Sequence, residues 1–307
     1  MTRTVFIDGG AGTTGIEIGA RLAGRSEFAL LTLDDARRKD PAARREALNE
    51  AEFVILCLPD DAAREAVSMI DSNHVRVIDA STAHRVTPGW TFGFPEVVGR
   101  EAVANAARVS NPGCYSTGFI ALMAPLVRAG LLPADWPYGC NAVSGFSGGG
   151  KGLIERFAAD PDIAWRGYAL EFGHKHVPEM QLHSGLTQRP LFSPAVIHAY
   201  RGMAVEVQLP LSAMPGAASP ERLRAELAAF YGDGPVVRMG EASGGELLLR
   251  ETNTGDDRME LYVFANPDGT QARLVALLDN LGKGASGAAV QSLNLMAGLP
   301  ETAGLRL

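Results

Sequence analysis

Short apolar runs alternate with amphipathic stretches over the first third of the chain. Apolar runs of strand length lie at residues 4–8, 28–33, 53–58 and 75–79, and helical patterns lie at 16–23, 41–50 and 61–70. The run at 53–58 is apolar throughout, as expected of a strand that is buried on both faces. Strands that alternate with helices at this spacing predict a parallel, doubly wound α/β sheet.

The pattern changes after about residue 110. Alternating apolar and polar positions predict strands at residues 204–209, 246–250, 260–265 and 271–278. Helical patterns are fewer and include residues 220–231 and a last helix at 284–297. The second part therefore reads as an α+β domain with a mostly antiparallel sheet, and the fold class is α/β plus α+β.

Composition places the chain among ordinary globular proteins. Its 307 residues suggest two domains at ~150 residues each. The net charge of -7 argues against a nucleic-acid binder, which normally has a basic surplus. The longest apolar stretch, residues 118–127, is shorter than the ~18 residues that indicate a membrane span. We expect an enzyme with neither nucleic acid nor membrane as a partner.

Cysteine usage and the N-terminus suggest a reducing compartment. The three cysteines, Cys57, Cys114 and Cys140, are an odd number and do not form a disulfide framework. The chain enters a strand-like run at Val5, which leaves no room for a signal peptide. The expected location is the cytoplasm.

Three glycines lie between the first predicted strand and the first helix. Gly9, Gly12 and Gly15, with Thr13 and Thr14, stand where backbone amides and a helix N-terminus can bind the pyrophosphate of a dinucleotide. The spacing is G-x-x-G-x-x-G, so the glycines alone also fit a tight turn that packs a helix on a sheet. Their place after the first strand of a βαβ pattern favours a dinucleotide site.

The end of the second predicted strand carries charges of both signs. Asp34 lies 19 residues past Gly15, where an acid would hold a ribose hydroxyl and favour NAD. Arg37, Arg38 and Lys39 follow, and they could hold a 2′-phosphate instead. A solvated charged loop is the third interpretation, and the sequence leaves all three open.

The segment around Cys114 carries the sharpest chemical signal. A Pro-Gly turn delivers Cys114 to the start of a helix predicted at residues 115–126. A helix N-terminus favours the thiolate, which makes Cys114 a candidate nucleophile. Cys57 lies inside an apolar run, and Cys140 has no neighbouring chemistry, so we expect both to be structural.

His174 and His176 stand two residues apart in a chain with six histidines. They have no accompanying cysteines or histidines at zinc spacing, so a metal site is not expected. One of them fits better as a general acid/base that serves a distant cysteine. For each one separately, a histidine satisfied by hydrogen bonds is the alternative, and we adopt that alternative for the four others, His74, His84, His183 and His198.

Two further glycine-rich segments are candidates for binding. Residues 144–151 include Ser144, Ser147 and Lys151 but lack the spacing of an ATP-binding phosphate loop, because glycine follows the lysine. They could still cradle a substrate or its phosphate. Residues 279–291, with Lys283 and Gly284, open a helix of small residues that permits close approach of a cofactor or of another helix.

Taken together, these motifs resemble the N-acetyl-gamma-glutamyl-phosphate reductase family in its shorter variety. The resemblance covers nearly the whole chain and rests on residues 9–15, 79–85, 111–118, 144–151, 174–179 and 283–291. The Pro-Gly-Cys-Tyr motif discriminates, because aspartate-semialdehyde dehydrogenases have a different residue before the cysteine. Glyceraldehyde-3-phosphate dehydrogenases have a Ser-Cys-Thr-Thr run instead.

The resemblance implies a fold, an activity and an assembly. A Rossmann-like dinucleotide-binding domain at residues 1–113 and 285–307 would flank a catalytic and dimerisation domain at 114–284. The chain would use NADPH to reduce N-acetyl-glutamyl 5-phosphate to N-acetyl-glutamate 5-semialdehyde and phosphate, in arginine biosynthesis. The family also suggests a homodimer or homotetramer.

The resemblance also assigns roles to individual residues. Cys114 would form a thioester, and His176 would be the acid/base, with His174 as the second choice. The residues expected to bind NADP are Gly9, Gly12, Thr13, Thr14, Gly15, Arg37, Arg38, Ser81, Lys283 and Gly284. Those expected to bind the substrate are Arg85, Ser144, Ser147, Lys151 and Glu179, and no metal is expected.

Three alternatives stay open at this point. The substrate could be a related acyl phosphate, aminoadipyl or aspartyl, because pocket size is not readable from the sequence. A cysteine and a histidine could also form a thiol hydrolase, although such an enzyme has no use for a dinucleotide fold. A non-catalytic dinucleotide sensor would bind the cofactor regardless of Cys114.

Overall fold

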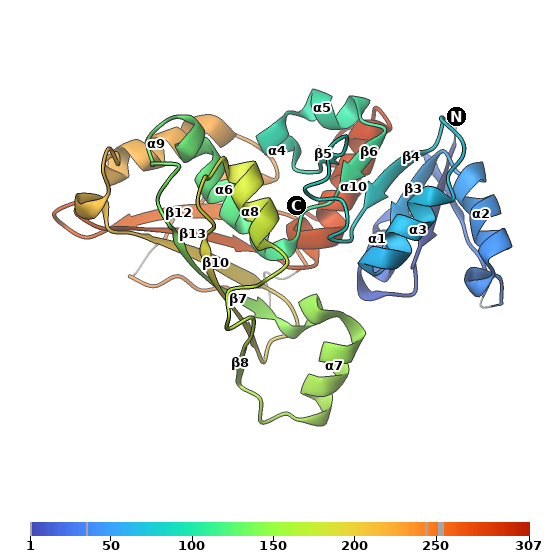
Figure 1. The fold of residues 1–307 in the computed structure, drawn as a ribbon, viewed down its shortest axis with the longest axis horizontal. Helices are drawn as coiled ribbons and strands as arrows, with labels where there is room; N and C mark the ends of the chain where they lie inside the picture. The colour runs from blue at the N-terminus through green and yellow to red at the C-terminus, as the bar shows by residue number, and fades with distance from the viewer. Residues whose placement is uncertain (1, 35, 243–244, 251–254) are drawn as a thin grey trace. The chain divides into compact units, whose positions relative to one another are not determined.

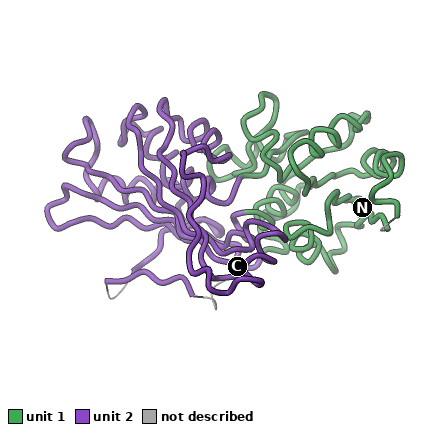
Figure 2. The backbone as a smooth tube through the Cα atoms, turned by 60° about the horizontal axis from the view of Figure 1, so that its bottom comes forward, with its two compact units in different colours: residues 1–112, 285–305 green, residues 113–284, 306–307 purple. Residues whose placement is uncertain are grey.

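The computed structural model describes residues 2–34, 36–242, 245–250 and 255–307. The chain forms two compact units, coloured separately in Figure 2. Unit 1 comprises Met1–Pro112 and Ala285–Leu305, and unit 2 comprises Gly113–Gly284 and Arg306–Leu307. The domain limits expected from the sequence were residues 1–113 with 285–307 for the first domain and 114–284 for the second. No described helix has the length and apolar character needed to cross a membrane.

Unit 1 contains a six-stranded sheet in which every pair is parallel. The strand order is β2-β1-β3-β4-β6-β5. The strands are β1 (Arg3–Asp8), β2 (Phe28–Leu31), β3 (Phe53–Leu56), β4 (Arg76–Asp79), β5 (Thr91–Phe92) and β6 (Arg108–Ser110). The helical elements are α1 (Thr13–Leu22), η1 (Arg37–Lys39), α2 (Pro41–Glu50), α3 (Asp60–Ser68), α4 (Pro95–Val98), α5 (Arg100–Asn105) and α10 (Gly287–Met296).

Helices cover both faces of this sheet, as Figure 1 shows for α1 and α2. One apolar core joins α1, α5 and α10 to alternate residues of the strands, such as Val5 and Ile55. The other joins α2 and α3 to the residues between them, such as Phe6 and Val54. The doubly wound α/β prediction is therefore confirmed, because successive side chains of each strand enter opposite cores.

Unit 2 contains a seven-stranded mixed sheet. Its order is β11-β12-β13-β10-β7-β9-β8, with parallel pairs only at β11-β12 and β7-β9. The strands are β7 (Gly139–Gly145), β8 (Trp165–Gly167), β9 (Leu191–Ile197), β10 (Met203–Leu209), β11 (Val237–Met239), β12 (Met259–Ala265) and β13 (Ala272–Leu278). The helical elements are α6 (Cys114–Arg128), η2 (Phe146–Gly149), α7 (Gly150–Ala159), α8 (Val177–Ser184), η3 (Leu211–Ala213) and α9 (Pro220–Tyr231). A π-helical turn, η5 (Gly282–Ser286), precedes α10.

One face of the mixed sheet is covered by helices. α6 packs on β10 and β13 so closely that a Cβ on Gly118 would lie 2.8 Å from Val205. The apolar cluster on the other face consists of strand residues and Leu247, and within the described residues no helix contributes to it. We call this second face, on which no described helix packs, the open face of the sheet.

The predicted strand at residues 246–250 is wrong. Residues 245–250 are described and form no strand, and Leu248 and Leu249 are exposed. The apolar run has a different physical cause, because Leu247 packs on the open sheet face beside Tyr262 and Val275. The predicted final helix at 284–297 is divided, since the π-helical turn ends at Ser286 before α10 begins.

Candidate active site

The turn between β1 and α1 has space only for glycine at two of the three predicted positions. Gly9 has a φ of +86°, and a Cβ there would lie 2.3 Å from the carbonyl oxygen of Cys57. A Cβ on Gly15 would lie 2.6 Å from the Cα of Gly10. Gly12 stands at the N-cap of α1 and donates its N–H to the Gly9 carbonyl at 2.9 Å. The turn thus brings backbone amides and a helix N-terminus together, as an anionic pyrophosphate requires.

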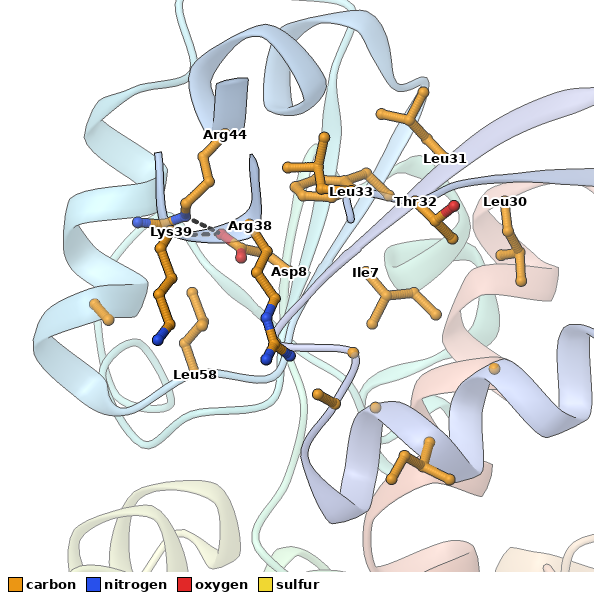
Figure 3. Close-up of a pocket in the computed structure, with 18 residues that line it drawn as sticks. Ile7, Asp8, Leu30, Leu31, Thr32, Leu33, Arg38, Lys39, Arg44 and Leu58 are labelled. Carbon is orange, nitrogen blue, oxygen red and sulfur yellow. Dashed lines mark hydrogen bonds and ion pairs between the residues drawn. The ribbon is translucent and has the colours of Figure 1, made fainter. Parts of the chain in front are cut away.

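A cavity of about 720 Å³ lies beside this turn, a volume in the range of small-ligand sites (Figure 3). Its wall comes from β1, the β1–α1 turn, α1, the end of β2, η1, α2 and α3. Three of the predicted cofactor residues line it, Gly9, Gly15 and Arg38. Five others in unit 1 do not, Gly12, Thr13, Thr14, Arg37 and Ser81.

The charges after β2 do not all face this cavity. Asp34 Oδ1 accepts the backbone N–H groups of Ala36 at 3.1 Å and Arg37 at 2.8 Å, so its side chain caps the η1 turn. The Arg37 guanidinium donates to Glu46 at 2.9 Å, and both side chains are more than half exposed. Neither Asp34 nor Arg37 lines the cavity.

Three cations and one acid form the charged end of the cavity wall. The cations are Arg38, Lys39 and Arg44, and the acid is Asp8 (Figure 3). Arg44 donates to Asp8 Oδ2 from two nitrogens, at 2.8 and 3.3 Å, and lies 3.5 Å from Glu65. Burial works to lower the pKa of Arg44, but Asp8 and Glu65 outweigh it and raise the pKa. No sequence pattern marks Arg44 as a site residue, because its position in a polar helix resembles a solvated face.

Ser81 lies in a buried network at the end of β4. Its hydroxyl donates to Asp79 Oδ2 at 2.7 Å, and its N–H donates to Asp79 Oδ1 at 2.9 Å. His84 Nδ1 lies 2.6 Å from the same carboxylate, and its ring stacks on Trp90 at 4.1 Å between centroids. His84 is thus satisfied by hydrogen bonding, as expected.

Arg85 is buried in the same unit. Its Nε donates to the Asn111 carbonyl at 2.9 Å, and a terminal nitrogen donates to the Ala80 carbonyl at 3.1 Å. The Asn111 side chain donates to the Ala285 carbonyl at 3.0 Å. These contacts hold the first residue of the Asn-Pro-Gly-Cys segment in place.

Cys114 is the first residue of α6, in unit 2. Gly113 precedes it in an extended conformation, and its carbonyl accepts the N–H of Thr117 and the hydroxyls of Ser116 and Thr117. These bonds fix the first turn of the helix beneath the cysteine. Cys114 is partly exposed and stands directly after the N-cap residue of α6.

The other two cysteines are less suited to nucleophilic attack. Burial raises the pKa of Cys57 to about 12, and the charges of Asp79 and Asp8 add to the shift. Burial also raises the pKa of Cys140, which is fully buried in β7. Both thiols stay protonated at neutral pH, in agreement with their expected structural role.

His174 and His176 lie beside the residue that follows the cysteine. Their ring centroids are 4.6 Å apart, and the Tyr115 ring lies 5.8 and 5.9 Å from them. His174 Nδ1 accepts the backbone N–H of His176 at 3.1 Å, so a neutral His174 ring carries its proton on Nε2. That nitrogen lies 3.3 Å from Tyr168 Oη. Both ring nitrogens of His174 are thus engaged by neighbours.

Two tyrosines complete this cluster. Tyr115 donates its hydroxyl to the Ala195 carbonyl at 2.9 Å. Burial raises the pKa of Tyr115, with Tyr168 and Cys114 adding to the shift and Ser144 opposing it. Burial also raises the pKa of Tyr168 to about 12, although its hydrogen bond with Tyr115 acts in the opposite direction. Both hydroxyls therefore stay protonated at neutral pH.

Glu179 links the two helices that carry the cysteine and the histidine. It lies in the first turn of α8, three residues after His176, and is 1% exposed. Its Oε2 accepts the N–H of Gly113 at 3.2 Å. The carboxylate thus holds the residue before Cys114, and its expected contact with the substrate stays a prediction.

The second glycine-rich segment divides between buried and exposed side chains. Ser144 is buried at the end of β7. Ser147 is buried in η2, and its hydroxyl accepts the Asn280 side chain at 3.0 Å. Lys151 lies on α7 with 86% of its side chain exposed and stands 3.9 Å from Glu155. The structure does not bring Lys151 into the cluster around Cys114.

The turn before α10 lies against Cys114. A Cβ on Gly284 would lie 2.9 Å from the Cβ of Cys114, so only glycine fits there. The Asp279 carbonyl accepts the N–H of Gly284 at 3.0 Å, and its carboxylate accepts the N–H of Leu281 at 2.8 Å. Lys283, in the same turn, is 1% exposed. Lys283 and Gly284 were predicted from the sequence as cofactor-binding residues. Asp279, the first residue of the same motif, was not predicted as a site residue.

Metal ligation was the alternative for the two histidines. Across residues 2–34, 36–242, 245–250 and 255–307, no three His, Cys, Asp or Glu side chains are grouped so that they could hold a metal ion. Their contacts instead link them to one another and to Tyr115 and Tyr168.

Two protein-family models match the chain. The model for the semialdehyde dehydrogenase NAD binding domain matches residues 4–106. The model for the semialdehyde dehydrogenase dimerisation domain matches residues 114–280. Together they cover most of the chain.

Several curated relatives match over nearly their full length. N-acetyl-gamma-glutamyl-phosphate reductase 2 of Pseudomonas putida is 50% identical over 311 residues, covering 99% of both chains. N-acetyl-gamma-glutamyl-phosphate reductase of Trichormus variabilis is 47% identical over 317 residues, covering 98% of both. The Burkholderia cenocepacia reductase of that name is 48% identical over 309 residues, covering 98% of this chain and 99% of its own.

Solved structures match at the level of the fold. Aspartate semialdehyde dehydrogenase II of Vibrio cholerae superposes with a TM-score of 0.71 at 16% identity, covering 97% of this chain and 99% of its own. Aspartate semialdehyde dehydrogenase with NADP from Candida albicans gives a TM-score of 0.61 at 13% identity, with the same coverage. The α/β plus α+β fold class is confirmed.

Proposed function

Because the chain belongs to the N-acetyl-gamma-glutamyl-phosphate reductase family of semialdehyde dehydrogenases, we propose that it performs the reaction of that name. NADPH reduces N-acetyl-glutamyl 5-phosphate to N-acetyl-glutamate 5-semialdehyde and phosphate, a step of arginine biosynthesis. The observation that carries the proposal is the 47–50% identity to reductases of this name over 98–99% of the chain.

The cavity of unit 1 fits the nucleotide part of an NADP molecule. The Gly9–Gly15 turn leaves space at Gly9 and Gly15 that a Cβ would fill, and its amides suit a pyrophosphate. Arg38 and Lys39 on the cavity wall suit a 2′-phosphate. Asp34, the acid that would favour NAD, caps the η1 turn instead. We therefore expect NADPH to bind more tightly than NADH.

Cys114 acts as the nucleophile in this proposal. Its thiolate attacks the acyl carbon, the bond to the phosphate oxygen breaks, and the phosphate leaves with that bonding pair. The thioester is reduced by the hydride that NADPH supplies when bound. The resulting thiohemiacetal then loses its hydroxyl proton, the carbon–sulfur bond breaks, and the aldehyde leaves Cys114 as a thiolate.

His176 exchanges the protons of these steps. It protonates the oxygen as the thiohemiacetal forms and accepts that proton again when the aldehyde is released. The contacts of His174 support this choice, because Nδ1 accepts a backbone N–H and Nε2 faces Tyr168. His174 is then a positioning residue for His176.

Several buried residues position the reacting groups. Glu179 holds Gly113, and Arg85 holds Asn111, so both fix the chain that leads into Cys114. Ser144, Ser147 and Lys151 are the proposed substrate contacts. Lys151 carries the only charge among residues 144–151, and an ammonium group suits a phosphate.

We further propose that two copies of unit 2 associate through the open face of its sheet. The match to a dimerisation domain supports self-association. Ala204 lies at the centre of this face, paired with Val143 on one side and Leu277 on the other. Ala204 and Val143 are partly exposed, so a second sheet packed there would bury apolar surface.

The expected location is the cytoplasm. All three cysteines are free. A catalytic thiol needs a compartment that keeps it reduced, and the cytoplasm is such a compartment.

The direct test runs the reaction backwards to avoid the unstable acyl phosphate. The full chain is mixed with N-acetyl-glutamate 5-semialdehyde, NADP and phosphate, and NADPH formation is followed by absorbance. Phosphate-dependent reduction that is lost in Cys114→Ser supports the proposal.

Other outcomes would change it. Activity with aspartate semialdehyde or the one-carbon-longer homologue alone would change the substrate and keep the mechanism. No activity with any aldehyde, with the cofactor bound, would favour a non-catalytic sensor.

A further inference from the structure

The cavity of unit 1 is lined by one carboxylate, that of Asp8, next to the strand end at which dinucleotide sites distinguish two ribose forms. Asp8 is the last residue of β1, and the pairing of Phe6 with Leu31 brings the ends of β1 and β2 side by side. In dinucleotide folds, an acid near the end of the second strand accepts the ribose hydroxyls of NAD. Asp34 is turned into η1, so Asp8 is the acid that this part of the wall presents.

Arg44 holds this carboxylate. Its Nε and one terminal nitrogen both donate to Asp8 Oδ2, at 3.3 and 2.8 Å. The Asp8 side chain is 8% exposed and the Arg44 side chain 13%, so water screens the pair weakly. Figure 3 shows the guanidinium beside Asp8, with Arg38 and Lys39 on the same side of the cavity.

The pair changes the charge that Asp8 presents at this end of the cavity. An unpaired Asp8 would repel a 2′-phosphate and would accept a hydrogen bond from a 2′-hydroxyl, which favours NADH. With Arg44 bound to it, the carboxylate is neutralised and no longer opposes a phosphate that enters beside Arg38 and Lys39.

We propose that Arg44 is a specificity-determining residue that masks Asp8, an acid that would otherwise select NADH. It acts through Asp8 and not by holding the 2′-phosphate itself. The inference rests on the proposed preference for NADPH and names the residue pair that produces it.

The test compares the affinities of the full chain for NADPH and NADH, which differ only in the 2′-phosphate. Both are measured by titration of nicotinamide fluorescence, without substrate. In Arg44→Gln, the Kd for NADPH should rise about tenfold, because the unmasked Asp8 carboxylate repels the 2′-phosphate, and the Kd for NADH should stay the same or fall. Adding Asp8→Asn to that variant should restore most of the NADPH affinity.

Two variants keep the outcome interpretable. The double variant removes both charges of the pair and leaves no buried charge uncompensated, so it reports on specificity even if Arg44→Gln alone is unstable. Arg45→Gln is the matched control, because Arg45 is adjacent on α2, half exposed and paired with Asp71 outside the cavity. Its affinities should equal those of the unmodified chain.

The results separate this inference from the proposed function. Equal losses for NADPH and NADH in Arg44→Gln would overturn the inference, because they would show a structural role. A double variant as weak for NADPH as Arg44→Gln would also overturn it, since Arg44 would then hold the phosphate directly. Either result together with aldehyde-dependent NADP reduction by the unmodified chain leaves the proposed function standing. Absence of NADPH binding in the unmodified chain would overturn both.

Discussion

Position distinguishes the three cysteines of this chain. Cys57 and Cys140 lie among apolar neighbours, and burial raises the pKa of each thiol. Cys114 instead is the first residue of α6. This difference was readable from the sequence, because a Pro-Gly turn before a helix predicts the helix end. The contacts of Glu179 were not readable, since they join residues 66 positions apart.

Glu179 gives a test of positioning against substrate binding. Glu179→Ala removes the acceptor of the Gly113 N–H, and the loss should lower the free energy of unfolding by about 1–3 kcal/mol and kcat by about tenfold. Glu179→Gln keeps an oxygen acceptor, so it should retain most of both. Chemical denaturation and steady-state kinetics measure them. A large rise in KM for Glu179→Gln with unchanged stability would instead indicate that the carboxylate binds substrate.

His176 gives a second test at the same scale. His176→Ala should lower kcat by about 10²–10⁴-fold and flatten the pH dependence of the rate near neutrality, because the proton carrier is lost. His174→Asn serves as the comparison and should lower kcat less while keeping the shape of the profile. An unchanged pH profile in His176→Ala would transfer the role to His174 or to water.

The sequence did not show which of the three cations after β2 would line the cavity. Arg37, Arg38 and Lys39 look equivalent in the sequence, yet Arg37 pairs with Glu46 and only Arg38 and Lys39 line the cavity. A side chain's direction in a short 3₁₀ turn depends on contacts with α2. Those contacts are tertiary, and no local pattern encodes them.

At the scale of elements, the β1–α1 turn is the most constrained segment. Gly9→Ala combines a left-handed φ with a clash against the Cys57 carbonyl, so it should cost about 1–2 kcal/mol of stability for the conformation and about 1–3 more for the overlap. Gly24→Ala is the matched control, because Gly24 has a φ of +76° and no atom within 4 Å of a Cβ. Chemical denaturation compares the two. Equal costs would mean that close packing at Gly9 contributes nothing.

Elements with a clear period were predicted well. The helices at Pro41–Glu50 and Pro220–Tyr231 have the predicted bounds, since a proline begins each and one apolar face continues to the end. The strands β7 and β9 were missed. β7 consists mostly of small residues and β9 contains Pro194, so neither shows the alternation of a half-buried strand. The run at 246–250 was misread because three leucines look like a strand when their packing partner is unknown.

At the scale of the molecule, the open sheet face predicts the assembly. Ala204→Arg places a charge at the centre of this face and should shift the protein from dimer to monomer at micromolar concentration. Phe230→Arg is the control, because Phe230 is exposed on α9 and lies outside the open face. Sedimentation velocity measures both. Dimers of Ala204→Arg with undiminished affinity would exclude this face as the interface.

The order of elements along the chain predicted the two fold classes. Which unit the last residues of the chain belong to depends on long-range contacts. The last two residues belong to unit 2, because Asp257 and Arg306 exchange hydrogen bonds at 2.7 and 2.9 Å. Such pairing between residues 49 positions apart has no local signature. The family resemblance, rather than hydrophobic periodicity, is what implied a discontinuous domain.

The proposed reaction depends on a thioester at Cys114. The full chain is mixed with N-acetyl-glutamate 5-semialdehyde and NADP in the absence of phosphate. We expect a burst of one NADPH per chain, an acylated Cys114 in the mass spectrum, and release of that acyl group on addition of phosphate. No burst despite steady turnover with phosphate, or a burst in Cys114→Ser, would show that the reaction does not pass through this thioester.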